Sequence, residues 1–225
     1  SQLAVLNANY IKESLKNDLF LPYDRPCMHE CVFTDKNQSE YKENVILMVE
    51  HPPVFTVGKR GGKENLVKSE TFLKAENMPV IQTGRGGNIT FHGPGQLVAY
   101  PIVNLRQAGK GIPEFVYLLE SVMIEIAAGF KVKADRDKRN HGIWVDKKKI
   151  GSVGLTIRRN ISFHGLALNV NMDLAPFSWI HPCGMPGVEM TSIEKEVLKS
   201  GINVSVTMEK AKQKMSECFE NLEIN

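Results

Sequence analysis

Apolar residues recur every three or four positions in three parts of the chain, and this spacing predicts amphipathic helices. The three parts are residues 5–19, residues 113–126 and residues 208–219. Pro113 suits the first turn of its helix, because the ring fixes φ and the N–H that it lacks would have no helical partner there. A further short helix is expected after Thr191, because Thr191 and Glu194 have the spacing of a capping box.

Short apolar runs between Gly, Pro and charged residues predict the strands. They cover residues 44–50, 54–57, 80–82, 96–103, 142–145, 149–157 and 161–171. The last three follow one another closely, so we expect a meander whose first turn is Asp146-Lys147-Lys148. Antiparallel strands with helices between the blocks indicate an α+β layer architecture. Because no repeat, low-complexity tract or linker interrupts the sequence, one domain over residues 1–225 is predicted.

The composition is that of a globular protein with a substantial core. The chain has 225 residues, of which 42% are hydrophobic and 24% charged. No apolar run is long enough to span a bilayer, and the first residues lack the basic and apolar regions of a signal peptide. The four cysteines do not have the spacing of a small disulfide framework. We therefore expect a cytoplasmic protein with reduced thiols and no membrane partner, or a mitochondrial matrix protein if a transit peptide was removed.

The formal net charge is only +3, but basic residues crowd the central third of the chain. This cluster is either an ordinary solvated face or a docking surface for an acidic partner. A nucleic-acid partner is disfavoured, because the net charge is modest and aromatic residues do not alternate with the basic ones. The cluster comprises Lys131, Lys133, Arg136, Lys138, Arg139, Lys147, Lys148, Lys149, Arg158 and Arg159.

Cys183 is the leading candidate for chemistry, because it lies between Pro182 and Gly184 in a stretch typical of a loop. A loop thiol can reach a substrate, but a free thiol titrates near ~8.5 and is only slightly ionised at neutral pH. A neighbouring cation would favour the thiolate. The spacing does not choose that cation, and it leaves an inert buried thiol as the alternative role of Cys183. The candidate cations are Lys149, His92, His164 and His181.

The other cysteines do not indicate a reactive site. Cys27 and Cys31 flank His29, but no second Cys or His pair follows at zinc-finger spacing, so no metal site is expected there. Cys218 lies near the apolar stripe of the C-terminal helix and is expected to pack in the core.

Residues 84–96 form a Gly-rich segment with five glycines. Glycines leave backbone N–H groups open to a ligand. The spacing is not that of a dinucleotide-binding fingerprint, and the Lys-Ser/Thr pair of a phosphate-binding loop is missing. Thr90 and His92 alternate on an extended stretch, so both side chains could face one cavity. An accessible thiol together with this segment suggests covalent acyl chemistry.

Four blocks of the sequence resemble the signature of the lipoyl(octanoyl) transferases, in their bacterial form. They are residues 85–96, residues 149–154, residues 162–169 and the step Pro182-Cys183-Gly184, which Thr191-Ser192 follows. The blocks occur in the order found in that family. The resemblance implies the catalytic fold of the biotin and lipoate protein ligases, an α+β single domain with mixed, mostly antiparallel sheets and flanking helices.

The resemblance also implies roles for individual residues. Cys183 would form an acyl thioester, and Lys149 would lower the pKa of its thiol and shuttle protons. His164 would support the site, whereas His181 falls outside the pattern and either tunes the thiol or faces solvent. No cofactor and no metal is implied. The substrate-binding residues would be Arg85, Gly86, Gly87, Asn88, Ile89, Thr90, Phe91, His92, Ser152, Val153, Gly154, Gly165, Leu166 and Ala167.

The activity implied by the resemblance is ping-pong transfer of an octanoyl or lipoyl group without ATP. The donor would be acyl carrier protein, and the acceptors would be lysines on the lipoyl domains of 2-oxoacid dehydrogenases and on the glycine cleavage H protein. Backbone N–H groups at Cys183-Gly184 or in the Gly-rich segment would hold the oxyanion. Two alternatives stay open. One is an ATP-dependent lipoate–protein ligase that would not need Cys183, and the other is a non-catalytic module that binds the carrier protein.

The same resemblance implies a role for the basic central third of the chain. Both protein partners of that family are acidic, so the basic residues would form a docking surface for them. We expect Arg136, Lys138 and Arg139 to contribute to docking, so that reversing their charges would weaken the use of the carrier protein.

Overall fold

The computed structural model describes residues 44–222 of the chain. The chain divides into two compact units, residues 1–44 and residues 45–225, and the helices and strands below belong to the second unit. The predicted helix over residues 5–19 and the cysteines Cys27 and Cys31 lie outside the described residues. The single domain expected for the whole chain stays a prediction.

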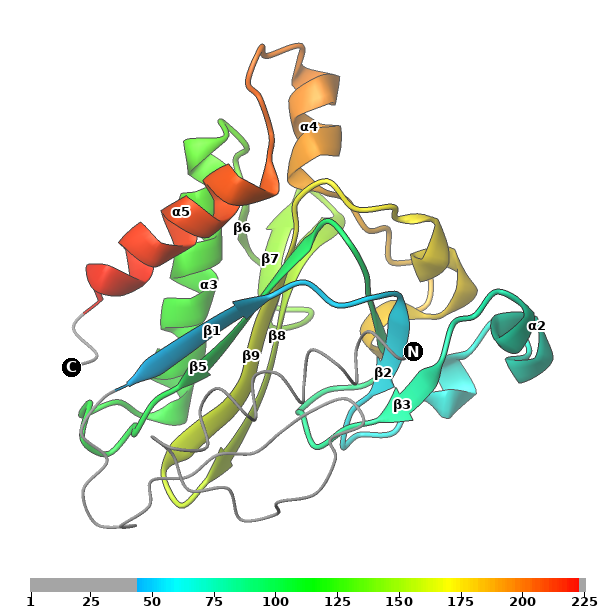
Figure 1. Cartoon of the computed structure of the whole chain (residues 1–225), viewed down its shortest axis with the longest axis horizontal. Helices are drawn as coiled ribbons and strands as arrows, with labels where there is room; N and C mark the ends of the chain where they lie inside the picture. Colours follow the sequence, from blue (N-terminus) through cyan, green and yellow to red (C-terminus); the bar gives the residue numbers. More distant parts are fainter. Residues whose placement is uncertain (1–43, 223–225) are drawn as a thin grey trace. The chain divides into compact units, whose positions relative to one another are not determined.

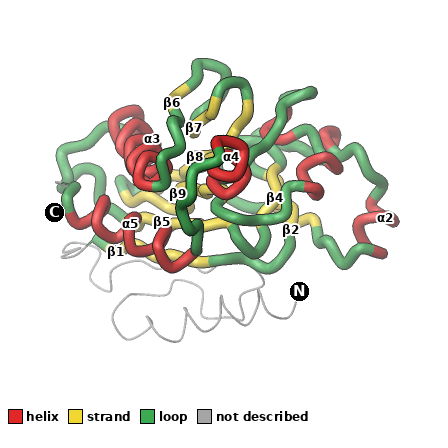
Figure 2. Tube along the Cα trace, turned by 90° about the horizontal axis from the view of Figure 1, so that it is seen from above, coloured by secondary structure: helices red, strands yellow, loops and turns green. Residues whose placement is uncertain are grey.

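A six-stranded antiparallel sheet has the strand order β1-β5-β9-β8-β7-β6, which can be followed in Figures 1 and 2. Its longest strands, β8 and β9, pair side by side along most of their length. The strands are β1 (Val45–Val49), β5 (Gln96–Ile102), β6 (Asp135–Arg136), β7 (Gly142–Val145), β8 (Lys148–Arg158) and β9 (Ile161–Asn169).

The predicted meander is present as β7, β8 and β9, with two corrections. Lys148 already pairs across the hairpin, so the turn is Asp146-Lys147 and not three residues long. Asp146 takes a φ of 54°, a left-handed conformation that tight hairpins need and that Asp tolerates. Strand β9 ends at Asn169 rather than Asn171, because the next two N–H groups donate to the carbonyl of Gly95.

A second, three-stranded sheet has the order β3-β2-β4. Among the described strands, β2 and β3 are the parallel pair, and the other pairings are antiparallel. The apolar side chains of this sheet pack in a cluster of their own, which includes Phe55, Phe91 and Phe177. The prediction of mixed, mostly antiparallel sheets is therefore confirmed. The strands are β2 (Val54–Val57), β3 (Val80–Gln82) and β4 (Thr90–His92).

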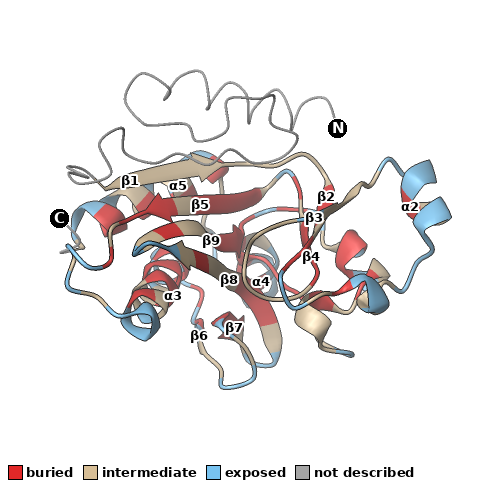
Figure 3. Ribbon diagram, turned by 90° about the horizontal axis from the view of Figure 1, so that it is seen from below, coloured by how far each residue is buried: buried red, intermediate tan, exposed pale blue. Residues whose placement is uncertain are grey.

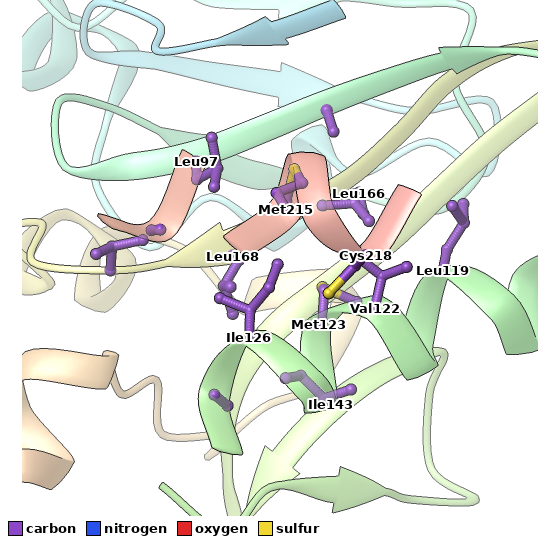
Figure 4. Close-up of a cluster of buried hydrophobic side chains, with 14 of the residues drawn as sticks. Leu97, Leu119, Val122, Met123, Ile126, Ile143, Leu166, Leu168, Met215 and Cys218 are labelled. Atoms are coloured by element: carbon purple, nitrogen blue, oxygen red, sulfur yellow. The ribbon is translucent and has the colours of Figure 1, made fainter. Parts of the chain in front are cut away.

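Helices α3 (Ile112–Gly129) and α5 (Met208–Glu220) pack against each other and against the large sheet (Figure 1). Both were predicted, and Pro113 lies in the first turn of α3 as expected. Cys218 is buried between them, as predicted, and burial raises the pKa of its thiol to about 12. Each large apolar side chain buried here contributes roughly 1.5–3 kcal/mol. Figure 4 shows the cluster of buried side chains between these helices and the large sheet. Its labelled members include Leu97, Leu119, Val122, Met123, Ile126, Leu166, Leu168 and Met215.

Helix α4 is the short helix predicted after Thr191, but it is capped differently. Its N-cap is Ser192, whose hydroxyl accepts from the N–H of Lys195. The predicted capping box of Thr191 and Glu194 is wrong, because the Thr191 hydroxyl donates to Glu196 instead. The remaining helices are α2 (Glu70–Ala75), α4 (Ile193–Ser200) and the 3-10 turns η1 (Lys63–Asn65), η2 (Ala175–Trp179) and η3 (Pro182–Gly184).

Burial is concentrated in the middle strands of the large sheet. Figure 3 shows β5 and much of β9 as buried, whereas α2 is mostly exposed. Within residues 44–222, no helix is long and apolar enough to cross a membrane.

Candidate active site

Cys183 lies on a tight turn in η3 and is partly exposed, as expected of a loop cysteine. Its backbone is left-handed, with φ 58° and ψ 20°, a conformation that costs a non-glycine residue on the order of 1 kcal/mol or more. Two hydrogen bonds hold the turn. The N–H of Cys183 donates to the carbonyl of Ile89, and the N–H of Gly184 donates to the carbonyl of His181, each at 2.9 Å. The first bond ties the backbone of Cys183 to the middle of the Gly-rich segment.

Lys149 is fully buried near the start of β8. Its Nζ donates to Oδ1 of Asn140 at 3.0 Å and to the carbonyl of His141 at 2.6 Å. The same atom lies 4.7 Å from the ring centroid of Trp144, within range of a cation–π contact. These contacts stabilise a buried amine that would otherwise be costly to remove from water.

Backbone geometry makes room for this amine. A β-bulge interrupts the pairing of β7 with β8 where Trp144 faces Lys149, and bulges re-aim neighbouring side chains. Gly142 in β7 has a φ of 123°, and a Cβ on it would lie 2.9 Å from Nζ of Lys149. The space that the amine occupies is therefore the space that a side chain at Gly142 would need.

The chain that follows Cys183 brings Lys149 and the thiol into one site. The N–H of Lys149 donates to the carbonyl of Glu189, and the N–H of Thr191 donates to the carbonyl of Lys149, each at 2.9 Å. Met190 between them forms a parallel bridge to Lys149. Cys183 also interacts electrostatically with the lysine. Of the four cations that the sequence left open, the structure brings Lys149 to Cys183.

Burial lowers the pKa of Lys149, and the negative charges of Cys183, Glu120 and Asp137 oppose this shift without cancelling it. A lysine with a lowered pKa exchanges its proton near neutral pH more readily than an exposed lysine. Lys149 can therefore act both as a cation beside the thiol and as a proton donor or acceptor.

The Gly-rich segment is held in place by hydrogen bonds from both sides. The guanidinium of Arg85 donates to the side chain and the carbonyl of Thr56 and to the carbonyl of Gly86. The N–H of Gly86 donates to the carbonyl of Leu155 in β8 at 2.9 Å. A Cβ on Gly154 would lie 3.2 Å from the Gly86 carbonyl oxygen, so a side chain here would require the two segments to move apart by a few tenths of an ångström. These residues position the segment, and their contact with a substrate stays a prediction.

Several other residues predicted to bind substrate are packed in the fold. Ile89 and Phe91 belong to the core of the small sheet, and Leu166 belongs to the core of the large one. A Cβ on Gly165 would lie 2.1 Å from the carbonyl oxygen of Ala99, so a larger residue would push β5 and β9 apart. Substrate contacts of the remaining members also stay predictions; Thr90 and Ala167 are buried, and Gly87, Ser152 and Val153 are partly exposed.

Asn88 lies beside the turn that presents Cys183. Its Oδ1 accepts from Nδ2 of Asn65 at 3.0 Å and from the N–H of Ile89 at 2.7 Å. A Cβ on Gly184 would lie 3.3 Å from Nδ2 of Asn88. The Asn88 side chain also hydrogen-bonds the carboxylate of Glu64, so one N–H of its amide is already engaged.

His92 and His164 are neutral in the fold. Nδ1 of His92 lies 2.7 Å from Oε1 of Gln96, an oxygen that only accepts, so Nδ1 carries the proton. Burial and neighbouring positive charges lower the pKa of His92 to about 3 and that of His164 to about 4. Neither ring is a cation at neutral pH, which removes both as partners of a thiolate. Among residues 44–222, no three His, Cys, Asp or Glu side chains are grouped to hold a metal ion.

The sequence did not single out Asn140, Gly142 or Trp144. The register of a hairpin with a two-residue turn places Trp144 opposite Lys149, so that contact was accessible from the sequence. Asn140 and Gly142 gave no such signal, because they act only through their position near the lysine amine. His181 is partly exposed, and both roles expected for it stay open.

Two arginines expected on a docking surface are engaged within the fold. Nε of Arg136 lies 3.1 Å from Oε2 of the buried Glu120. The guanidinium of Arg139 pairs with Asp137 at 2.7 Å and lies 4.1 Å above the ring of Trp144. Both arginines therefore support the segment around Lys149 as well as contributing charge.

Comparisons of the sequence with known proteins agree on one family. Residues 22–220 match the family model of the lipoyl protein ligase A/B catalytic domain. An octanoyltransferase of Desulfotalea psychrophila is 47% identical over 169 residues, which cover 74% of this chain and 76% of that protein. An octanoyltransferase of Hydrogenovibrio crunogenus is 44% identical over 161 residues, which cover 72% of this chain and 75% of that protein.

Solved structures of ligases have the same fold. A lipoate-protein ligase A bound with ATP has a TM-score of 0.63 at 13% identity, covering 80% of this chain and 72% of its own. An archaeal bi-partite lipoate protein ligase from Thermoplasma acidophilum has a TM-score of 0.63 at 14% identity. The match covers 80% of this chain and 71% of the ligase chain. Likeness at this identity shows the fold alone, and it confirms the ligase-type catalytic fold predicted from the sequence.

Proposed function

The chain belongs to the octanoyltransferases of the lipoyl protein ligase A/B catalytic family, and on that premise we propose that it transfers an octanoyl group from acyl carrier protein to a lipoyl-domain lysine through a thioester on Cys183. It is an acyltransferase. The observation that supports the covalent route best is the meeting of a partly exposed thiol with a buried lysine amine in one site. The acyl group arrives activated as a thioester, so the proposed reaction needs no ATP.

In the first half of the reaction, the Cys183 thiolate attacks the carbonyl carbon of the octanoyl thioester. The ammonium of Lys149 stabilises the thiolate beforehand. The bond to the pantetheine sulfur breaks, and that sulfur takes a proton from Lys149 as it leaves. The enzyme is then an octanoyl thioester with a neutral lysine beside it.

In the second half, the neutral amine of the acceptor lysine attacks the same carbonyl. Lys149 accepts the proton that the attacking nitrogen loses, and the Cys183 sulfur leaves as a thiolate. The product is an amide, and the ammonium–thiolate pair is restored. A lysine whose pKa is lowered by burial is suited to both steps, because it must lose and regain one proton in each cycle.

The tetrahedral oxyanion needs hydrogen-bond donors, and one of the two sources expected from the sequence is already in use. The N–H groups of Cys183 and Gly184 donate to backbone carbonyls. We assign the role instead to the side-chain amide of Asn88 in the Gly-rich segment, because its Nδ2 would lie 3.3 Å from a Cβ on Gly184 and it has a second N–H besides the one that bonds Glu64. A fixed amide donor of this kind contributes on the order of 3–4 kcal/mol in other acyl-transfer sites.

Docking of an acidic carrier protein would use exposed lysines close to Lys149. Lys138 and Lys147 are exposed, and they lie in the turns that precede and follow β7. Reversal of both charges should raise the KM for the carrier protein at low salt and leave kcat nearly unchanged. Arg136 and Arg139 are poorer choices for such a test, because their ion pairs also support the active site.

An ATP-dependent ligase route remains the alternative to the thioester route. The two are distinguished by incubating the protein with octanoyl acyl carrier protein in the absence of ATP and measuring the intact mass. We expect an octanoyl adduct on the wild type, no adduct on Cys183→Ala and slow formation on Lys149→Ala. Transfer that appears only with ATP and free octanoate would favour the ligase. Absence of any transfer would contradict the proposed thioester route.

A further inference from the structure

The amine of Lys149 is enclosed on one side by four residues of the stretch 140–144. An ammonium has three N–H donors. Two of them are directed at oxygens, Oδ1 of Asn140 at 3.0 Å and the carbonyl of His141 at 2.6 Å. Gly142 and the ring face of Trp144 close the same side. One donor is therefore left, and Cys183, which interacts electrostatically with Lys149, is the group that we expect it to face.

We propose that Asn140 is a positioning residue that, with the carbonyl of His141, holds two protons of Lys149 in place so that the third is the one transferred. The inference rests on the acyl transfer proposed above and adds a residue to it. Asn140 lies in the connection between β6 and β7 and does not belong to any of the four sequence blocks that indicated the family.

The two hydrogen bonds fix the orientation of the Lys149 amine in both of its protonation states. When Lys149 gives its third proton to the leaving pantetheine sulfur, two N–H groups remain, and the same two oxygens still accept them. The lone pair then occupies the position of the lost proton. It faces the acyl thioester, where it can accept the proton of the attacking acceptor amine. Without Asn140, the neutral amine would be free to turn its lone pair away.

The oxygens that hold the amine are anchored to helix α3. Oε1 of Glu120 accepts from the N–H of Gly142 at 2.8 Å and lies 3.5 Å from Nδ1 of His141. Oε2 of the same carboxylate accepts from Nε of Arg136 at 3.1 Å. The connection is thus fixed at both of its ends, which directs the carbonyl of His141 toward the lysine.

Charged groups from three elements act on Lys149. They are Cys183 from η3, Glu120 from α3, and Asp137 and Arg139 from the connection before β7. Burial lowers the pKa of Lys149. The Asn140 oxygen acts in the opposite direction, because it accepts a hydrogen bond from the ammonium and so favours the charged form. Loss of this oxygen should therefore lower the pKa further, and a carboxylate in its place should raise it.

The test compares Asn140→Leu, which removes the acceptor at similar size, with Asn140→Asp, which adds a negative charge. Single-turnover transfer from octanoyl acyl carrier protein is followed as a function of pH. We expect Asn140→Leu to slow transfer by tenfold or more, with an unchanged KM for the acceptor. In a plot of rate against pH, the fall in rate at alkaline pH reports deprotonation of Lys149. For Asn140→Leu this fall should move to lower pH by about one unit, and for Asn140→Asp it should move to higher pH. Asn203→Leu, an exposed residue between α4 and α5, is the matched control and should resemble the wild type.

Opposite shifts of the alkaline fall in the two variants would support the proposal, because a purely structural defect would move both variants alike. Wild-type rates and pH profiles in both variants, or shifts in the same direction, would overturn it. If Asn140→Leu fails to fold, Asn140→Ser takes its place, and the upward shift of Asn140→Asp still decides. Failure of the wild type to form the Cys183 adduct would instead overturn the proposed function, which keeps the two failures separate.

Discussion

Gly142 and Lys149 are packed so closely that a Cβ on Gly142 would lie 2.9 Å from Nζ of the lysine. The same Cβ would lie 2.2 Å from the carbonyl oxygen of Gly151, and the φ of Gly142 is 123°. Few side chains tolerate that backbone, and none would fit beside the amine. A position with no side chain therefore decides where the proposed proton carrier lies.

Replacing Gly142 with Ala should both destabilise the fold and displace the Lys149 amine. We expect a fall in the transfer rate of about 100-fold or more and a clear drop in Tm. The control is Gly201→Ala at the C-cap of α4, where φ is 67° and no atom lies within 4 Å of the added Cβ. That change should cost only about 1 kcal/mol and leave transfer intact. Similar Tm and rate losses in both variants would show that crowding of Lys149 is unimportant.

Alkylation of Cys183 by iodoacetamide should depend on Lys149. The thiolate is the reactive form, and the neighbouring ammonium stabilises it. At neutral pH, Lys149→Met should therefore slow alkylation of Cys183 by tenfold or more. Peptide mapping by mass spectrometry isolates Cys183 from the other thiols. Cys218 is an internal control, because burial raises its pKa to about 12 and it should stay unmodified in both proteins. Equal rates at Cys183 would contradict the proposed pair.

Stability should decline in acid because His92 is buried as a neutral ring. Its pKa is about 3 in the fold, against 6.5 for an unperturbed histidine. Between these values the unfolded chain binds a proton that the folded chain does not. The contribution of neutral His92 is therefore complete above pH 6.5 and is lost as the pH falls toward 3.

Urea unfolding at several pH values between 4 and 7 measures this dependence. His164, with a pKa of about 4, contributes in the same direction. We expect His92→Gln to have a shallower decline of the unfolding free energy than the wild type. A variant that loses stability in acid as steeply as the wild type would place the effect elsewhere.

Glu196 should stabilise the strand start that contains Lys149. Its Oε1 accepts from Nζ of Lys148 at 2.7 Å and from the hydroxyl of Thr191 at 2.5 Å. Burial alone would raise the pKa of Glu196, but these donors outweigh it and lower the pKa, so the carboxylate stays charged. Glu196→Gln should cost roughly 1–3 kcal/mol. A double-mutant cycle with Lys148→Met, read by urea unfolding, should give a non-zero coupling energy, and strict additivity would argue against the pair.

Local patterns determined most of the secondary structure and pointed to Cys183 as the candidate nucleophile. The strands and the helices α3 and α5 were predictable because hydrophobic spacing depends on neighbours a few residues away. The short elements α2 and β6 were not predicted, and the other errors were at ends and caps. Thr191 was predicted to cap α4, but its hydroxyl reaches Glu196, and a competing partner inside the fold cannot be read from capping-box spacing.

Tertiary structure removed two of the four possible cations and left Lys149 as the proposed partner, with the role of His181 still open. Spacing left Lys149, His92, His164 and His181 open, and only the fold buries the two rings as neutral groups and brings Lys149 to Cys183. The resemblance had named Lys149 by analogy, and the structure supplies a physical basis through burial and neighbouring charge.

The sequence by itself determined the elements, the blocks typical of the family and the loop that presents Cys183. Only the tertiary structure decided that the Cys183 and Gly184 amides are already bonded, and that Asn140 holds the lysine amine. The physical reason is range. Periodicity and turn chemistry act between neighbours in the chain, whereas burial, hydrogen-bond partners and electrostatic shifts arise between residues that only folding brings together.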